Sequence, residues 1–168
     1  RTANGQEFQS DYVDIRPTPV IDSVVWNTDE DGVNIYVNAH DASAGTRYYR
    51  WDYVETWQYN AAVSSDFKVE NNVPVYRNAD ERIYTCWRTL PSTKISISST
   101  VRLSEDVIYR YPLTTIPKGS SKISVRYSIL VKQLGITKEA YNFWNILKKN
   151  TELTGTLFDP QPSKMPSN

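Results

Sequence analysis

The chain has 168 residues, which suits one domain, and its 19 Lys and Arg residues equal its 19 Asp and Glu residues in number. A zero net charge without a local basic cluster disfavours nucleic-acid binding, and no apolar stretch comes near the roughly 20 residues of a membrane-spanning helix. The single cysteine, Cys86, excludes an internal disulfide and a multi-thiolate metal site, while 12 Tyr and 5 Trp residues favour β-strands.

The first residues are predicted to connect this domain to another one. Residues 1–18 are interpreted as the end of a preceding domain plus a Pro-rich hinge, with one short strand over Tyr12–Ile15. Pro17 and Pro19 fix φ and keep their neighbours extended, which is typical of a linker. We therefore predict a domain boundary here and one β-sandwich domain over residues 19–168, ending in a Pro-rich extended tail.

The next segment carries a hairpin signal. Val20–Trp26 is predicted to form a strand, and apolar residues alternate with polar ones over Val33–Val37. The acidic turn between them ends in Asp31-Gly32. This turn resembles the start of a calcium loop, but its twelfth position is Asn38 instead of the bidentate Glu that such a loop requires. We therefore expect a plain turn and no metal site.

A run of aromatic residues at alternate positions follows. From position 49 to position 59 the odd positions are aromatic except for Glu55: Tyr49, Trp51, Tyr53, Trp57 and Tyr59. At ~3.3 Å per residue the whole run is about 43 Å long, whereas a typical strand spans ~17–20 Å. We expect Tyr49, Trp51 and Tyr53 to be in the core. Glu55, Trp57 and Tyr59 are the candidate binding residues, because rings on an open strand end can stack on sugars or peptides.

Glu55 leaves three alternatives open. An unpaired charge on a buried face is costly, so a buried Glu55 would have to meet an arginine such as Arg88 or Arg126. Glu55 could instead lie in a cleft as a catalytic acid. The length of the strand favours a third alternative, in which Glu55 is exposed where the strand leaves the core.

The remaining strands are less regular. Asn60–Asp80 lacks clean periodicity and is predicted to be a long excursion with partial strand content. Val125, Tyr127 and Ile129 alternate on a later strand and are expected to share the core with the aromatic run. The strands predicted here are Arg82–Leu90, Lys94–Ile97 and Ile123–Val131, and Asp106–Leu113 is ambiguous.

One helix is predicted over about residues 137–151. Thr137 is its N-cap, and one apolar face contains Ala140, Phe143, Trp144 and Leu147. We expect this face to cover a sheet edge or a sandwich end. Short strands separated by turns, with one inserted α-helix, predict a mainly β fold: an immunoglobulin/fibronectin-like antiparallel β-sandwich.

No set of residues predicts catalysis. His40-Asp41 is the one His–carboxylate pair in the sequence, and no Gly-x-Ser-x-Gly elbow supplies a nucleophile, so we expect the pair to stabilise a strand end. Cys86 lies between aromatic residues on a strand pattern, which favours an inert buried thiol. We therefore assign no catalytic residues, no metal ligands and no cofactor.

An ordered set of short motifs covers nearly the whole chain. They are Pro19–Ser23, Gly32–Val37, His40-Asp41 with Tyr48–Trp51, Cys86-Trp87, Leu103–Ile108, Arg126–Val131, Glu139–Tyr141 with Trp144, and Gly155–Pro162. Together they resemble the Bacteroidetes outer-membrane lipoproteins grouped as domain of unknown function 4249. The family has no established catalytic residues to carry over.

The resemblance implies a lipidated protein of the outer membrane, on its periplasmic side or on the cell surface. It also implies an immunoglobulin-like sandwich before this region and an accessory role beside a TonB-dependent receptor in nutrient uptake. We expect this sequence to be the C-terminal region of such a protein, without the lipobox cysteine, most of the first domain and the segment after the Pro-rich tail.

Three functions are compared on this basis. The favoured one is a non-catalytic binding or scaffolding module, with the receptor, or a glycan or peptide ligand, as its partner. The first alternative is a glycan- or peptide-acting hydrolase, which needs two carboxylates about 5–5.5 Å or about 6.5–9.5 Å apart, one of them Glu55. The second alternative is a structural spacer. A second acid beside Glu55 would favour the hydrolase.

Overall fold

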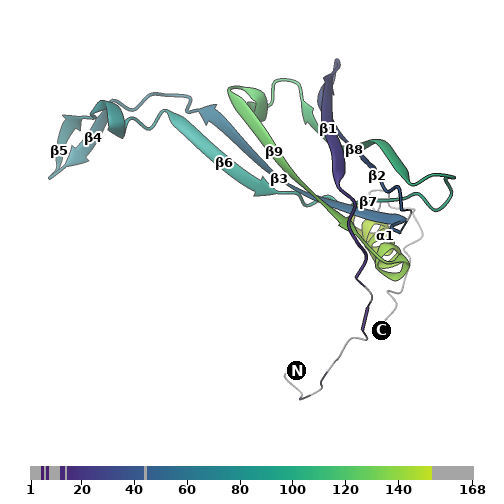
Figure 1. The fold of residues 1–168 in the computed structure, drawn as a ribbon. Coiled ribbons are helices and arrows are strands. Elements are labelled where there is room, and N and C mark those ends of the chain that lie inside the picture. The colour runs from purple at the N-terminus through teal and green to yellow at the C-terminus, as the bar shows by residue number, and fades with distance from the viewer. Residues whose placement is uncertain (1–4, 6, 8–11, 14, 44, 153–168) are drawn as a thin grey trace, which may run out of the picture.

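The protein has a mainly β, antiparallel architecture with one α-helix among the described residues, in agreement with the prediction of a β-sandwich that carries a helix (Figure 1). The computed structural model describes residues 5, 7, 12–13, 15–43 and 45–152. Sheet A consists of β1 (Ile21–Thr28), β2 (Gly32–His40) and β8 (Val107–Pro117), in the order β1-β2-β8.

Sheet B is built around one long strand, β3 (Tyr48–Asn60). One edge of β3 pairs with β9 (Arg126–Gly135). The other edge is shared by β7 (Ser96–Ser99), which pairs with the first half of β3, and β6 (Thr85–Pro91), which pairs with the second half. Between these two strands the backbone N–H of Ser92 donates to the Tyr53 carbonyl at 2.7 Å. Both edges of β3 are therefore used along most of its length.

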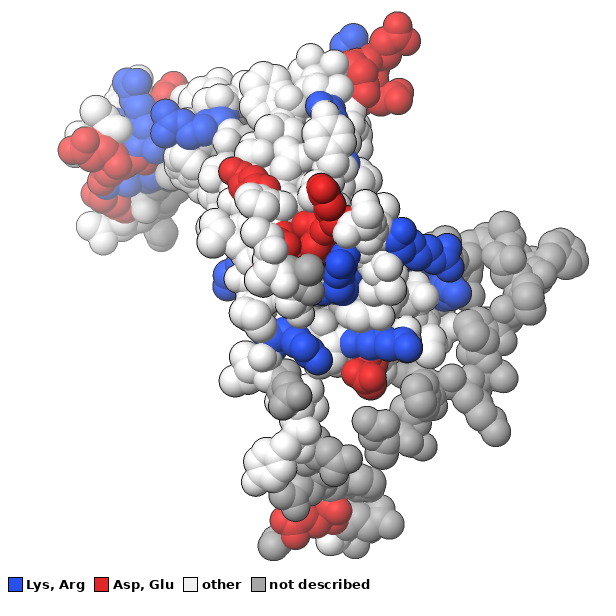
Figure 2. Space-filling model, turned by 45° about the vertical axis from the view of Figure 1, so that its right-hand side comes forward, with Lys and Arg blue, Asp and Glu red and all other residues white. Residues whose placement is uncertain are grey.

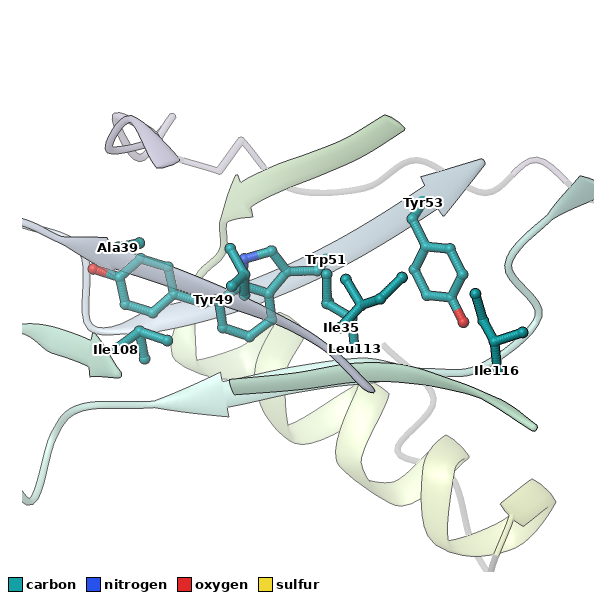
Figure 3. Close-up of a cluster of buried hydrophobic side chains, with 9 residues drawn as sticks. Ile35, Ala39, Tyr49, Trp51, Tyr53, Ile108, Leu113 and Ile116 are labelled. Carbon is teal, nitrogen blue, oxygen red and sulfur yellow. The ribbon is translucent and has the colours of Figure 1, made fainter. Parts of the chain in front are cut away.

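The core lies between sheets A and B (Figure 3). Tyr49, Trp51 and Tyr53 are buried, which confirms their predicted place. The Trp51 ring stacks on Tyr111 at 4.4 Å between centroids. The same cluster contains six aliphatic side chains from sheet A: Ile35, Val37, Ala39, Ile108, Leu113 and Ile116.

Two of the three residues of the predicted strand Ile123–Val131 that were expected in this core pack against it. Tyr127 and Ile129 do so and are partly buried. Val125 is 48% exposed, so the prediction was wrong at this residue. The reason is that β9 begins only at Arg126. The chain before it forms a short 3-10 helix, η2 (Ser121–Ile123), which breaks the alternation assumed for the longer strand.

The predicted hairpin between the first two strands is present. The Asp29 carboxylate closes the turn by accepting hydrogen bonds from the backbone N–H groups of Asp31 and Gly32, at 3.0 and 3.1 Å. Gly32 has φ +145°, and a Cβ there would lie 2.1 Å from the Ile116 carbonyl oxygen. Glycine is therefore required where β2 runs alongside β8.

The irregular stretch after β3 contains a second hairpin that the sequence analysis did not resolve. Its strands are β4 (Phe67–Glu70) and β5 (Val73–Tyr76), followed by the 3-10 helix η1 (Ala79–Glu81). The two turn residues, Asn71 and Asn72, both have positive φ, 50° and 65°, as a two-residue type I′ turn requires. The strand predicted at Tyr12–Ile15 is not formed by its described residues, and Asp14 lies outside them.

The helix α1 (Lys138–Glu152) begins where predicted, because the Thr137 hydroxyl accepts a hydrogen bond from the Ala140 N–H at 3.2 Å. It packs against the start of β3 and against the edge strand β7. The Arg50 guanidinium lies 3.7 Å from the Trp144 ring centroid, and the Tyr48 and Tyr141 rings are 5.2 Å apart. Tyr48 and Arg50 alternate with core residues on β3, so α1 covers the outer face of sheet B.

The Pro-rich segment before β1 is hydrogen-bonded to Gln133 of sheet B and to Thr46, which lies just before β3. The Pro17 carbonyl accepts from the Thr46 hydroxyl at 2.6 Å, and the Pro19 carbonyl accepts from the Gln133 side-chain amide at 2.9 Å. These bonds tie the start of sheet A to the end of β9. The domain boundary at residue 18 stays a prediction. No helix within the described residues is long and apolar enough to span a membrane.

Candidate functional site

Glu55 is buried, with only 7% of its surface exposed, so the expectation of an exposed Glu55 was wrong. One carboxylate oxygen accepts from the Lys122 ammonium at 2.6 Å, and the other accepts from the Tyr127 hydroxyl at 2.9 Å. Neither Arg88 nor Arg126 is the partner. Lys122 belongs to η2, and the connection between β8 and β9 folds over β3 beyond the main core. Strand length alone could not reveal this cover.

Trp57 is also buried, with 5% of its surface exposed. Its ring lies between two cations, with the Lys122 ammonium 5.2 Å and the Arg88 guanidinium 5.9 Å from the ring centroid. Tyr59, the third candidate, is partly buried and pairs with Cys86 across β3 and β6. The three candidates therefore share a strand face, but they do not form an open aromatic platform.

The Glu55 cluster is electrostatically self-contained. Burial, together with the hydrogen bond to Glu55, raises the pKa of Tyr127, so its hydroxyl stays protonated and keeps donating. Lys122 supplies the positive charge that balances the carboxylate. The side chains that bond to Glu55 within the described part of the chain are a cation and a phenol. Among these residues no group of three or more His, Cys, Asp or Glu side chains is placed to hold a metal ion.

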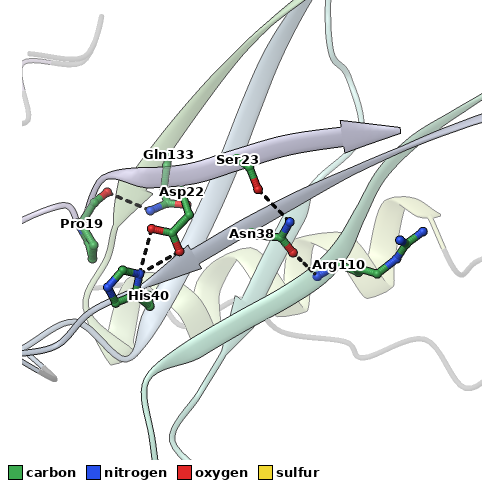
Figure 4. A network of polar contacts seen from close by, with 7 residues as sticks. All are labelled: Pro19, Asp22, Ser23, Asn38, His40, Arg110 and Gln133. Carbon is green, nitrogen blue, oxygen red and sulfur yellow. Dashed lines mark hydrogen bonds and ion pairs between the residues drawn. The ribbon is translucent and has the colours of Figure 1, made fainter. Parts of the chain in front are cut away.

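His40 is found at a strand end, as predicted, but its partner is Asp22 and not the adjacent Asp41 (Figure 4). Its Nδ1 lies 2.8 Å from a carboxylate oxygen of Asp22, and this hydrogen bond raises the pKa of His40. The Asp41 carboxylate instead accepts from Ser43 and from the Thr46 N–H, and the Ser43 hydroxyl lowers the pKa of Asp41. Cys86 is only partly buried on β6, so it is less enclosed than expected.

The feature that the sequence analysis missed is a projecting arm. We define the arm as residues 54–92: the second half of β3, the β4–β5 hairpin, η1 and β6. Its inner part belongs to sheet B, and its outer part, with the β4–β5 hairpin, extends away from the two sheets (Figure 1). Trp57 is the one apolar side chain of the arm that is buried. The exposed apolar side chains of the arm are Val63, Phe67, Val69, Val73, Tyr76, Ile83, Tyr84, Trp87 and Leu90.

The outer part of the arm is held together by its own contacts. The Phe67 and Tyr76 rings are 4.3 Å apart across the hairpin. Lys68 bridges Glu70, at 2.6 Å, and Glu81 of η1. These two carboxylates raise the pKa of Lys68, and Lys68 in turn lowers the pKa of Glu81. The hairpin therefore presents its apolar side chains from a fixed frame.

Charges of both signs are interspersed on the arm, with basic Lys68 and Arg77 close to acidic Glu70 and Glu81. Figure 2 shows the same mixture of blue and red at the far end of the arm. A single-sign field is therefore absent from this surface, and the apolar side chains dominate what a partner would meet. The signal in the sequence was the paired Asn71-Asn72 between short apolar runs, which marks a two-residue turn.

Comparison with known proteins identifies a family. The family model described as domain of unknown function (DUF4249) matches residues 1–168. No curated protein and no solved structure matches the chain.

Proposed function

The chain belongs to the domain of unknown function 4249 family, and we propose that it is a non-catalytic binding or scaffolding module that docks on a partner protein through the arm. The observation that carries this proposal is the exposure of aliphatic and aromatic side chains along an element that projects from the body. Large exposed apolar patches mark interaction sites in folded proteins, and the arm carries nine exposed apolar side chains.

The arm suits a protein partner better than a sugar. Trp57 is buried, five of the nine exposed apolar side chains are aliphatic, and two of the four exposed rings, Phe67 and Tyr76, lie against each other. The salt bridges of Lys68 hold the hairpin in place before binding, so less conformational entropy is lost on docking. Free strand edges on β4, β5 and β6 add main-chain donors and acceptors.

The proposed partner is a TonB-dependent receptor, and the proposed location is the outer membrane, through a lipid anchor. The ordered motifs from Pro19 to Pro162 support this partner and this location through the family resemblance. The hydrolase alternative rests on Glu55, whose oxygens are taken by Lys122 and Tyr127. A structural spacer would not require exposed apolar side chains on the arm.

The test is co-purification of the full-length lipoprotein from its native outer membrane. Val69→Lys and Trp87→Lys place charges on two exposed apolar positions of the arm, and Tyr109→Lys does the same on β8, away from the arm. We expect the receptor to co-purify with wild type and with Tyr109→Lys, and to be lost with either arm variant. Retention of the receptor by both arm variants would contradict the proposal.

A further inference from the structure

The interior of the sandwich is uncovered along β1. Val24 pairs with Val37, and Trp26 pairs with Ile35, in the antiparallel register of β1 and β2. Side chains of directly opposed residues point to the same face of a sheet. Val37 and Ile35 are in the core, so Val24 and Trp26 also face inwards. Yet Val24 is 40% exposed and Trp26 is 70% exposed.

The uncovered interior forms an apolar groove of about 470 Å³ between β1 and β9. Its wall on sheet A includes Val24, Trp26 and Ile35, and its wall on sheet B includes Tyr127 and Ile129. No charged side chain lines it. A groove with inward-facing core residues on both walls is the space that one further strand of the sandwich would fill.

Two strand edges border this groove. Among the described strands, β1 pairs with β2 alone and β9 pairs with β3 alone. Each strand therefore has a second edge whose N–H and C=O groups have no ladder partner. At one end the groove is closed, because Gln133 of β9 bonds to the Pro19 carbonyl just before β1 (Figure 4). From this point β1 and β9 diverge towards the other end, which is open (Figure 1).

The open end is acidic on its β1 side, whereas β9 begins there with the exposed Arg126. The turn that follows β1 contains Asp29, Glu30 and Asp31, all exposed. It lies at the tip of β1, where Figure 2 shows a group of carboxylates with a basic side chain beside it at the top of the molecule. The Asp29 carboxylate is used inside the turn, whereas Glu30 and Asp31 face solvent. A basic residue of the occupant on the β1 side of this end is therefore complementary in charge.

We propose that the groove binds an extended segment of a partner protein, which adds to sheet B as a strand beside β9. Its alternate apolar side chains would cover Val24 and Trp26, and its backbone would pair with the free edge of β9. A basic residue at one end would face Glu30 and Asp31. This site shares no residue with the arm, so the proposal stands or fails independently of the function proposed above.

The probe is a panel of fluorescein-labelled peptides of about nine residues, long enough for one strand, with Thr alternating with Val, Ile, Leu or Phe and with Lys at both ends. Binding to the 168-residue chain is measured by fluorescence anisotropy, and amide hydrogen exchange locates the protected strand. Three control peptides have the same composition in non-alternating order, N-methylated alternate amides, or Glu at both ends.

We expect at least one alternating peptide to bind and to protect β9 amides, and each control peptide to bind at least about tenfold more weakly. Trp26→Lys should weaken binding by a similar factor, whereas the matched Trp87→Lys on the arm should not change it. Because Trp26 is largely exposed, this variant should keep the wild-type circular dichroism spectrum.

Several results would overturn the proposal. They are the absence of binding by every alternating peptide, equal binding of the N-methylated peptide, or protection confined to the arm. Concentration-dependent dimerisation that protects β9 and is lost in Trp26→Lys would assign the groove to a second copy instead. Binding of a detergent such as dodecyl maltoside with the same loss in Trp26→Lys, but no peptide binding, would assign it to an apolar small molecule.

Discussion

At the scale of single residues, Glu55 illustrates how a carboxylate is held on an otherwise aromatic strand face. Its oxygens accept hydrogen bonds from Lys122 and Tyr127, and Lys122 also lies over the Trp57 ring. Burying a charge is costly unless the charge is paired and hydrogen-bonded. Lys122 therefore compensates Glu55 and covers Trp57 at once, and it fastens the β8–β9 connection to β3.

Removing Lys122 should expose that dependence. Lys122→Met leaves Glu55 buried without its cation, and we expect a loss of about 2–3 kcal/mol in the free energy of unfolding, below the full cost for a buried pair because Lys122 is partly exposed. Glu55→Gln in the same chain should recover most of this loss. Urea denaturation measures both variants. If the free energy of unfolding of Lys122→Met alone were within about 0.5 kcal/mol of wild type, the pair would contribute little to stability.

His40 offers a second test, because it is the only histidine of the chain and its NMR signal needs no assignment among several. The hydrogen bond to Asp22 raises the pKa of His40 above 6.5 in the folded state. A raised pKa means that the pair stabilises the fold fully below pH of about 6.5, the unfolded value, and that this contribution is lost as pH rises through the folded pKa.

In Asp22→Asn the pKa of His40 should fall towards its ordinary value, and the decline in stability over that pH window should flatten. Titration of the His40 ring proton by NMR gives the first quantity, and urea midpoints at several pH values give the second. An unchanged pKa in Asp22→Asn would mean that Asp22 does not set it.

At the scale of elements, alternation and helical periodicity were enough to place most of sheets A and B and the helix. The aromatic positions from Tyr49 to Tyr53 and the Thr137 cap were predictable because one strand face and one helix end determine them locally. What covers a face was not predictable. Glu55 and Trp57 are buried by η2, which lies more than sixty residues further along the chain, and no local pattern reports such a contact.

The helix shows the same limit. Its apolar face was predicted, but the surface that it covers depends on Arg50 and Tyr48, polar or amphipathic residues on the outer side of β3. The β4–β5 hairpin escaped because four-residue strands carry too little alternation to be recognised. The candidate binding residues Glu55, Trp57 and Tyr59 were chosen because aromatic residues alternate on this strand. In the structure the exposed apolar side chains lie on other parts of the arm.

Trp144 tests the contact between the helix and sheet B. The side chain is partly buried, so Trp144→Ala should cost about 1–3 kcal/mol, below the value for a fully buried ring. A double-mutant cycle with Arg50→Met should give a coupling of about 0.5–2 kcal/mol, from the cation over the ring. Denaturant unfolding with an unchanged slope measures both. A coupling of zero would show that the stacking is incidental.

At the scale of the whole molecule, β3 joins two regions with different packing. Its first half, with Tyr49 and Trp51, is enclosed by sheet A, whereas its second half belongs to the arm. Exposed apolar side chains occur in many parts of the described chain, and two of these parts are the arm and the groove between β1 and β9. These two surfaces are the ones through which the proposed module would bind its partners.

Removing the outer arm separates folding from binding. Ala61 and Tyr84 are already joined by a backbone hydrogen bond of 2.8 Å, so residues 62–83 can be replaced by Asn-Gly, which closes β3 and β6 as a short hairpin. None of the residues 62–83 is buried. We therefore expect a folded chain whose free energy of unfolding stays within about 1 kcal/mol of wild type, with a slightly smaller denaturant slope. Circular dichroism and urea unfolding measure the stability of the shortened chain, and receptor co-purification from the outer membrane should be lost.

Loss of cooperative unfolding in the shortened chain would show that the arm is part of the folding core. The function proposed for the arm would then lack its basis.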